Sequence, residues 1–323
     1  MKSNAQPESY PPLIDRVVVV TGPTASGKSD LGISLSKRMS IEIVSLDSIA
    51  VYRHMNVGTA KPTVEQQSQV PHHLIDLVDP SDEFSVAEYL GRLHPLLDQI
   101  ESRHRVPILV GGTPLYLRAV LRGFAPGPPP DWDFRTWCEQ QTEGRPSDWL
   151  WTEVQKIDEP SAAKIHPADH RRLIRAWEFY RQTGASISSH QNQFGEVPNA
   201  SDVAVFGVTR PRAELHTRIE KRVDLMLDGG LVEEVRGLID RFKVLSRTAR
   251  QAVGYREVID HVEGKIDHSA CRQQIIEHTR RLARKQSTWM RSSTEVTPID
   301  LSSLSVEEAV DLMLDRIKGL EGT

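Results

Sequence analysis

Apolar residues in the first part of the chain fall into short β-branched runs that alternate with segments of helical spacing. The run at residues 16–21 reads Arg-Val-Val-Val-Val-Thr and stops at a Gly-Pro pair, which is typical of a buried parallel strand. By the same pattern, strands are expected at 16–21, 41–46, 73–77 and 106–110, and helices at 28–39, 84–102 and 113–121. Strands that alternate with helices predict an α/β fold, with a parallel sheet flanked by helices.

The pattern changes after Phe124. Residues 125–130 contain four prolines, which can continue neither a helix nor a central strand. Residues 131–198 are polar, helix-leaning and hold five of the six tryptophans, and a strand-like run then returns at 203–208. Further helices are expected at 212–227, 231–242, 254–262, 269–290 and 305–320. These boundaries predict a flexible N-terminus (1–13), the first part of the core (14–124), a helical insertion domain (125–200) and a completion of the core with basic C-terminal helices (201–323).

Composition and charge narrow the class of protein. The 323 residues are 38% hydrophobic and 26% charged, as in ordinary globular domains. The net charge of -4 means that any nucleic-acid site must be a local basic patch. Cys138 and Cys271 form no Cys-x-x-Cys pair, which argues against a disulfide framework or a zinc finger. Without an apolar run of membrane-spanning length or an apolar leader, the sequence predicts a cytoplasmic protein with no membrane contact.

The strongest chemical signal is a Gly-x-x-x-x-Gly-Lys-Ser motif between the first strand and the first helix. Its glycines let successive backbone N–H groups turn onto phosphate oxygens, and the helix that follows adds its positive dipole end. Lys28 supplies a mobile charge and Ser29 can bind Mg²⁺. The alternative is a glycine turn with an exposed lysine. The motif predicts a P-loop, and therefore a P-loop NTPase-like core, that binds a polyphosphate through Gly22, Pro23, Thr24, Ala25, Ser26, Gly27, Lys28 and Ser29.

A carboxylate after the second strand is the next candidate. A nucleotide hydrolase usually has a second apolar strand that ends in Asp, but the run at 106–110 ends in Gly111-Gly112-Thr113. Asp47 instead follows the strand at 41–46, where a side chain faces the ligand crevice of a parallel sheet. Asp47 is therefore expected to be a metal ligand or a general base. The alternatives are that Asp47 and Thr113 only cap the helices that follow them.

Seven sequence blocks carry a family resemblance. They stand at 22–29, 47–62, 70–76, 109–116, 169–176, 253–257 and 279–291, and they include Val-Pro-His-His-Leu-Ile-Asp, Val-Gly-Gly-Thr-Pro-Leu-Tyr and Gln-Ser-Thr-Trp-Met-Arg. Their order resembles that of the tRNA dimethylallyltransferases, which are also called tRNA isopentenyltransferases. Position 50 departs from the family pattern, because Ala50 stands where glutamine is common and cannot hydrogen-bond to a base through its side chain.

The resemblance implies a reaction and roles for named residues. A dimethylallyl group would pass from dimethylallyl diphosphate to N6 of adenosine 37 in tRNAs that read codons beginning with U. Lys28 and a Ser29-bound Mg²⁺ would stabilise the diphosphate, and Asp47 would accept the N6 proton. Thr24 and Thr113 could orient the donor and the base. Arg218 and Arg222, one helical turn apart, could add charge at the diphosphate or could be solvated surface residues.

Basic residues in two regions predict contacts with tRNA. The insertion is a plausible clasp on the anticodon stem-loop, although its tryptophans could equally form a small helical core. Residues 271–291 hold six basic residues against one acidic, which favours a track for an RNA backbone over a merely solvated helix face. The resemblance and the charge pattern together predict tRNA contacts at Asp47, Ser48, Ile49, Ala50, Thr113, Arg135, Arg171, Arg172, Leu173, Ile174, Arg175, Arg250, Gly254, Tyr255, Arg256, Arg280, Arg281, Arg284 and Lys285.

Three other functions remain open from the sequence. The same P-loop could serve a small-molecule kinase that uses ATP, or a non-catalytic binder. The prenyl-transfer chemistry could also act on a free adenine nucleotide, although a basic helix favours a large RNA. No obligate protein partner is expected.

Overall fold

The computed structural model describes residues 9–191 and 200–321. The chain divides into two compact units. One comprises Met1–Pro12 with Arg122–Glu196, and the other comprises Leu13–Leu121 with Val197–Thr323. Each unit is described by itself below.

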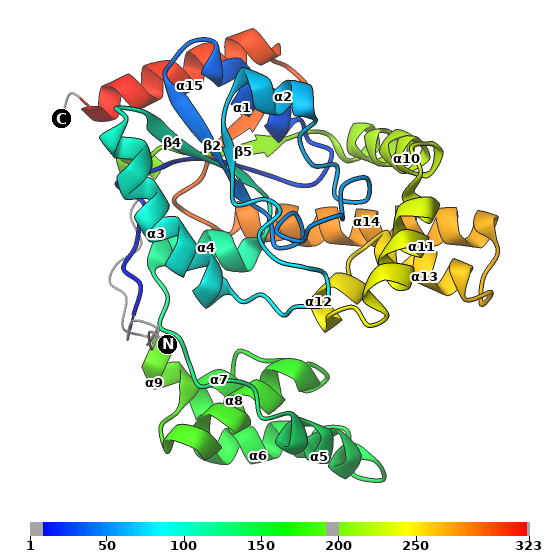
Figure 1. Cartoon of the computed structure of the whole chain (residues 1–323). Helices are drawn as coiled ribbons and strands as arrows, with labels where there is room; N and C mark the ends of the chain where they lie inside the picture. Colours follow the sequence, from blue (N-terminus) through cyan, green and yellow to red (C-terminus); the bar gives the residue numbers. More distant parts are fainter. Residues whose placement is uncertain (1–8, 192–199, 322–323) are drawn as a thin grey trace, which may run out of the picture. The chain divides into compact units, whose positions relative to one another are not determined.

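The larger unit is built on a six-stranded parallel sheet, which confirms the predicted fold class (Figure 1). Its strand order is β3-β2-β4-β1-β5-β6. The strands are β1 (Val18–Thr21), β2 (Ile41–Leu46), β3 (His72–His73), β4 (Val106–Gly111), β5 (Val205–Thr209) and β6 (Thr297–Asp300). The strand expected at 73–77 shrinks to the two residues of β3, and the edge strand β6 was not predicted.

The helices α1 (Lys28–Ser36) and α3 (Val86–Ser102) pack on strands of this sheet. The other helices of the unit are α2 (Val64–Gln69), α4 (Pro114–Arg122), α10 (Arg212–Asp228), α11 (Leu231–Phe242), α12 (Arg247–Arg250), α13 (Tyr255–Val262), α14 (His268–Arg291) and α15 (Val306–Glu321), of which α11, α12 and α13 pack on other helices. Leu31 and Leu35 of α1 share a buried cluster with Val310 of α15 and with strand residues, and α1 and α15 lie side by side in Figure 1. The helix α10 packs on α14, an arrangement that builds one wall of the site described below.

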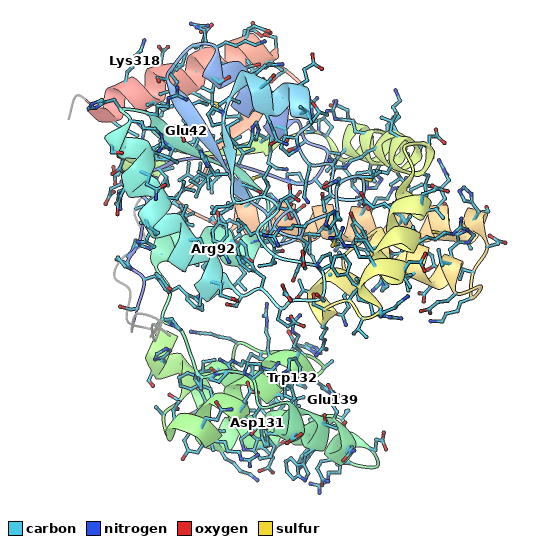
Figure 2. The ribbon with its side chains drawn as sticks, viewed as in Figure 1. Glu42, Arg92, Asp131, Trp132, Glu139 and Lys318 are labelled. Atoms are coloured by element: carbon cyan, nitrogen blue, oxygen red, sulfur yellow. The ribbon has the colours of Figure 1, made fainter. Side chains whose placement is uncertain are left out.

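A buried carboxylate fixes the β3 edge of the sheet. Glu42 of β2, labelled in Figure 2, has a side chain that is only 3% exposed. It accepts hydrogen bonds from Arg103 at 2.8 and 2.6 Å and lies 2.6 Å from His73. Hydrogen bonds from Arg103, assisted by His73, lower the pKa of Glu42 against the opposing effect of burial. This pairing explains why β3 stays in the sheet although it is only two residues long.

The smaller unit is helical. Its helices are α5 (Trp132–Thr142), α6 (Trp149–Ile157), α7 (Glu159–Ala162), α8 (His170–Thr183) and α9 (Ile187–Gln191). Trp177 makes edge-on ring contacts with Phe134, Trp137 and Trp149 at centroid distances of 5.6, 5.9 and 5.8 Å. Phe134, Trp149, Trp151 and Trp177 thus contribute to a core, while Trp132, labelled in Figure 2, and Trp137 remain 48% and 43% exposed.

The flexible N-terminus (1–13) stays a prediction, although its last residues have backbone partners. Residues 1–8 lie outside the described residues. Tyr10 is 5% exposed, its N–H donates to Phe124 O at 2.7 Å, and its carbonyl accepts from Phe124 N at 2.9 Å. Leu13 is also buried. The polar, proline-containing composition of this segment concealed a backbone pairing that depends on a partner more than a hundred residues away.

Candidate functional site

The loop after β1 has the backbone conformation that its motif requires. Gly22 has a φ of 146°, and a Cβ there would lie 2.7 Å from Val208 O of the neighbouring strand. Ala25 and Gly27 have φ values of 63° and 105°, in the left-handed region. The chain then enters α1 at Lys28. The result is a tight loop whose N–H groups precede a helix N-terminus, as in a phosphate-binding nest.

Two arginines hold the carbonyl groups of this loop. Arg210 Nε donates to Ser26 O at 2.8 Å, and Arg218 Nε donates to Ala25 O at 2.7 Å. Since C=O and N–H point in opposite directions across a trans peptide, anchoring the carbonyls turns the following N–H groups the other way. Among the described residues, the buried Ser26 Oγ has no hydrogen-bond partner. A buried hydroxyl without a partner is costly, and a phosphate oxygen would satisfy it.

The loop forms one side of a pocket of about 590 Å³. Lys28, Asp47 and Gln286 line it together with Lys61 and a stripe of α10. That stripe consists of Arg218, Lys221, Arg222 and Leu225. The pocket therefore gathers five cationic side chains and two carboxylates, Asp30 and Asp47, and this excess of positive charge suits a ligand of high negative charge.

Charges within the pocket shift each other's protonation. Burial, and secondarily the positive charge of Arg222, lower the pKa of Lys28 to about 7 against the opposing effect of Asp47. Burial also lowers the pKa of the Arg222 guanidinium, again opposed by Asp47. Lys28 Nζ donates to Pro23 O at 2.7 Å. Within the described residues, Lys28 forms no ion pair with a carboxylate. A bound diphosphate would provide an anionic partner for it.

Asp47 combines a capping role with a place in the pocket. Its Oδ1 accepts hydrogen bonds from Ile49 N at 2.8 Å and Ala50 N at 3.2 Å. Within the described part of the chain, no hydrogen bond to Oδ2 is found, so one carboxylate oxygen remains available for a ligand. Thr113 Oγ1 accepts from Ser48 N at 3.0 Å and donates to Ser48 Oγ at 3.4 Å. Thr113 thus secures the backbone that presents Asp47.

Sequence reasoning missed the side chains that hold the pocket walls together. Gln286 of α14 bonds to both the P-loop and the loop after β4. Glu234 of α11 accepts from the N–H groups of Asn56, Val57 and Gly58 at 2.8, 2.8 and 3.3 Å, which fixes the segment leading to Lys61. Lys61 itself, with a side chain 4% exposed, binds Asp76 at 2.6 Å. Gln286 and Lys61 lie in two of the seven sequence blocks and Glu234 lies outside all of them, but in each case only the fold reveals the partner.

A second pocket, also of about 590 Å³, lies between α10 and α14 and touches Pro23. We call it the basic groove, and its arginines are Arg210, Arg212, Arg280, Arg281, Arg284 and Arg291. Arg280 pairs with Glu220, Arg210 pairs with Glu214, and Arg281 is 3.9 Å from Glu277. Six arginines against three nearby carboxylates leave the groove positively charged. Lys285 is exposed on the same helix.

Other residues of this unit that were predicted to contact RNA form ion pairs or hydrogen bonds within the unit. Arg250 bonds to Glu263 at 3.1 Å, and Arg256 bonds to Glu257 at 2.8 Å. The Tyr255 ring is fully buried and its hydroxyl donates to Glu234 at 2.7 Å. A Cβ at Gly58 would lie 2.5 Å from that ring. The block around Gly254 and Tyr255 therefore supports a wall of the pocket.

In the helical unit, the predicted contacts separate into exposed and buried groups. Arg171 and Arg172 are exposed at the start of α8. Leu173 and Ile174 are buried in the core, which leaves only their backbone for a ligand. Arg135 and Arg175 bind the fully buried Glu178, with Oε1 at 2.7 Å and Oε2 at 2.5 Å respectively. Burial would raise the pKa of Glu178, but hydrogen bonds from these two arginines lower it.

The described residues contain no cluster of three or more His, Cys, Asp or Glu side chains able to hold a metal ion. Across residues 9–191 and 200–321, no helix is long and apolar enough to cross a membrane.

The chain is similar to known proteins of one family. Residues 50–293 match the model of the family described as IPP transferase. The tRNA dimethylallyltransferase of Rhodopirellula baltica is 45% identical over 98% of each chain. The crystal structure of the tRNA isopentenylpyrophosphate transferase of Bacillus halodurans is 35% identical, has a TM-score of 0.69, and aligns over 95% of this chain and 98% of its own. A eukaryotic dimethylallyltransferase acting on tRNA, 24% identical with a TM-score of 0.73, shares the fold.

Proposed function

Because this chain belongs to the IPP transferase family, we propose that it transfers a dimethylallyl group from dimethylallyl diphosphate to N6 of adenosine 37 in tRNA. The proposed acceptors are tRNAs that read codons beginning with U. The single observation that carries the proposal is the pocket itself, in which the P-loop and three cationic side chains of α10 lie together with the carboxylate of Asp47. This arrangement serves a reaction with a diphosphate leaving group and a weak nitrogen nucleophile.

Departure of the diphosphate is the first requirement. The allylic C–O bond breaks with its electron pair on the diphosphate oxygen, so negative charge grows there. P-loop N–H groups, Lys28 and the α10 cations Arg218 and Arg222 lie where they can stabilise that charge without rearrangement. Arg218 also anchors Ala25 O, so one residue both shapes the loop and faces the donor. Thr24 lines the same pocket and is assigned to the donor.

Proton removal from the acceptor is the second requirement. The N6 lone pair forms the new C–N bond, and the proton lost from N6 passes to Asp47. The two backbone hydrogen bonds to Oδ1 fix the carboxylate, and Oδ2 is assigned as the atom that takes the proton. Thr113 acts indirectly, by holding Ser48 and thus the Asp47 loop.

Mg²⁺ fits this donor set as a partner of the diphosphate. Ser29 and Asp47 line the same pocket and offer only oxygen ligands, which Mg²⁺ prefers. The absence of a cluster of three side-chain ligands in the described residues suits an ion held mainly by phosphate oxygens. When bound, the ion would neutralise charge on the leaving group.

For the RNA, we propose two contact regions. The first is the basic groove, whose positive side chains suit phosphates on either side of an extruded base. The second is the exposed start of α8, with Arg171 and Arg172. A cytoplasmic location follows from a tRNA substrate.

One experiment distinguishes this function from that of a kinase. The protein is incubated with Mg²⁺, unmodified tRNA, and either dimethylallyl diphosphate or ATP, and the phosphate products are quantified. We expect diphosphate release from the isoprenoid donor that depends on tRNA, with ATP unchanged. Consumption of ATP with no diphosphate from the isoprenoid donor would overturn the proposal in favour of a kinase.

A further inference from the structure

The side-chain amide of Gln286 joins the P-loop to the loop after β4. Its Oε1 accepts from Thr24 N of the P-loop at 2.9 Å, and its Nε2 donates to Gly112 O at 2.7 Å. The residue comes from α14, which is 262 positions from Thr24 and 174 from Gly112 in the sequence. A side-chain amide carries an acceptor oxygen and a donor nitrogen on the same carbon, one for each of these two backbone groups.

The bridge is closely fitted. A Cβ added at Gly112 would lie 2.7 Å from Gln286 Nε2 and 2.7 Å from Gly22 O, so glycine is required for the loops to approach. The peptide between Pro23 and Thr24 is held at both edges, since its carbonyl accepts from Lys28 Nζ and its N–H donates to Gln286. The orientation of this P-loop peptide is therefore set jointly by Lys28 and Gln286.

The same bridge reaches the acceptor side. Gly112 is followed by Thr113, whose hydroxyl holds Ser48 N beside Asp47. Gln286 is consequently bonded directly to the P-loop and is connected to the Asp47 loop through Gly112 and Thr113. The neighbours of Gln286 on α14, Arg284 and Ser287, line the basic groove. RNA that binds in the groove would thus contact α14, the helix that supplies Gln286.

From this geometry we infer that Gln286 is a positioning residue. It sets the separation of the P-loop from Asp47, and it connects RNA binding on α14 to the alignment of these two groups. The inference rests on the proposed function. A misplacement of about 1 Å at a reacting centre can cost on the order of 100-fold in rate, so loss of the bridge should reduce the chemical step much more than RNA affinity.

The test uses two substitutions and a matched control. Gln286→Met keeps the length of the side chain but removes both hydrogen bonds. Gln273→Met makes the same change on α14 at an exposed position whose amide bonds only to Glu277 at 3.0 Å. We expect Gln286→Met to lower the single-turnover rate by roughly 10- to 100-fold, with the Kd for tRNA within twofold of the unaltered protein. Gln273→Met should change neither quantity, and thermal unfolding of both variants should show that they are folded.

Gln286→Glu adds a signature that a general loss of packing would not give. A carboxylate keeps the acceptor for Thr24 N but faces Gly112 O with a second acceptor. Because this substitution nearly preserves the size of the side chain, the single-turnover rate of Gln286→Glu should fall below that of the unaltered protein with the Kd for tRNA within twofold.

Several results would overturn the inference. They are a rate of Gln286→Met or Gln286→Glu within threefold of the unaltered protein, or a loss that lies wholly in the tRNA Kd. Diphosphate affinity is measured by calorimetry on the same variants. If the unaltered protein forms no prenylated RNA but Gln286→Met binds diphosphate more weakly, the proposed function fails while the bridge to the P-loop stands. If the affinity of Gln286→Met for diphosphate is also unchanged, Gln286 has no positioning role.

Discussion

Lys28 should take up a proton when diphosphate binds. Its pKa of about 7 in the empty site contrasts with an ordinary value of 10.5. At pH 8 such a group is about one-tenth protonated, and at pH 6 about nine-tenths. A bound diphosphate places several negative charges beside the ammonium and restores its charged form. The expected uptake at this residue is therefore about 0.9 proton at pH 8 and about 0.1 at pH 6.

Isothermal titration calorimetry measures this uptake directly. Diphosphate is titrated at each pH in buffers of different ionisation enthalpy, and the slope of the binding enthalpy against that enthalpy gives the number of protons bound. Lys28→Met removes the group, so the difference between the two proteins isolates Lys28 from protons exchanged by the diphosphate itself. Lys37→Met, at an exposed position just after α1, serves as the matched control and should leave the uptake unchanged.

A difference near zero between the unaltered protein and Lys28→Met at pH 8 would refute this account of the pocket. The lowered pKa of Lys28 also determines how the free energy of unfolding changes with pH. Between pH 7 and 10.5 the unfolded chain binds more protons at Lys28 than the empty folded protein does, so this residue makes the free energy of unfolding rise with pH across that window.

Two further predictions concern charges in the two units. Glu178→Gln should lower the free energy of unfolding of the helical unit by about 3 kcal/mol, because Arg135 and Arg175 then lose their buried carboxylate partner. Tryptophan fluorescence during denaturation measures this change. As a control, Glu139→Gln on the exposed face of α5 (Figure 2) should have little effect. A loss equal to that of the control would show that the buried pairs contribute nothing. Arg284→Gln should reduce the slope of log affinity for tRNA against log salt by about 0.7. As a control, Arg38→Gln removes a charge that lies just after α1 and pairs with Asp311 of α15, and it should leave the slope unchanged. Equal slopes for both variants would exclude Arg284 from the RNA contact.

Sequence patterns predicted the features that depend on local spacing. The P-loop and the core strands are contiguous, and their hydrophobic periodicity determines them before any partner is known. Asp47 was identifiable for the same reason, since it immediately follows a strand. The family blocks then connected these elements to one chemistry.

Features that depend on distant partners could not be predicted. Gln286 gains its role only when α14 crosses the P-loop, 262 residues away in sequence. Arg135 was expected to meet RNA because it is an arginine in a tryptophan-rich insertion, yet a buried Glu178 occupies it. The strand β6 has only four residues and includes Pro298, so its pattern is too weak to separate it from a loop.

The most direct test of the central claim maps the product on the RNA. Unmodified tRNA is incubated with the protein, Mg²⁺ and dimethylallyl diphosphate, digested to short fragments, and analysed by tandem mass spectrometry, in parallel with Asp47→Asn. We expect one dimethylallyl group on N6 of adenosine 37 and a rate for Asp47→Asn that is roughly 100- to 10,000-fold lower, with tRNA affinity within a few-fold of the unaltered protein. An unmodified adenosine 37, or a product formed at a near-normal rate by Asp47→Asn, would contradict the assignment of this pocket.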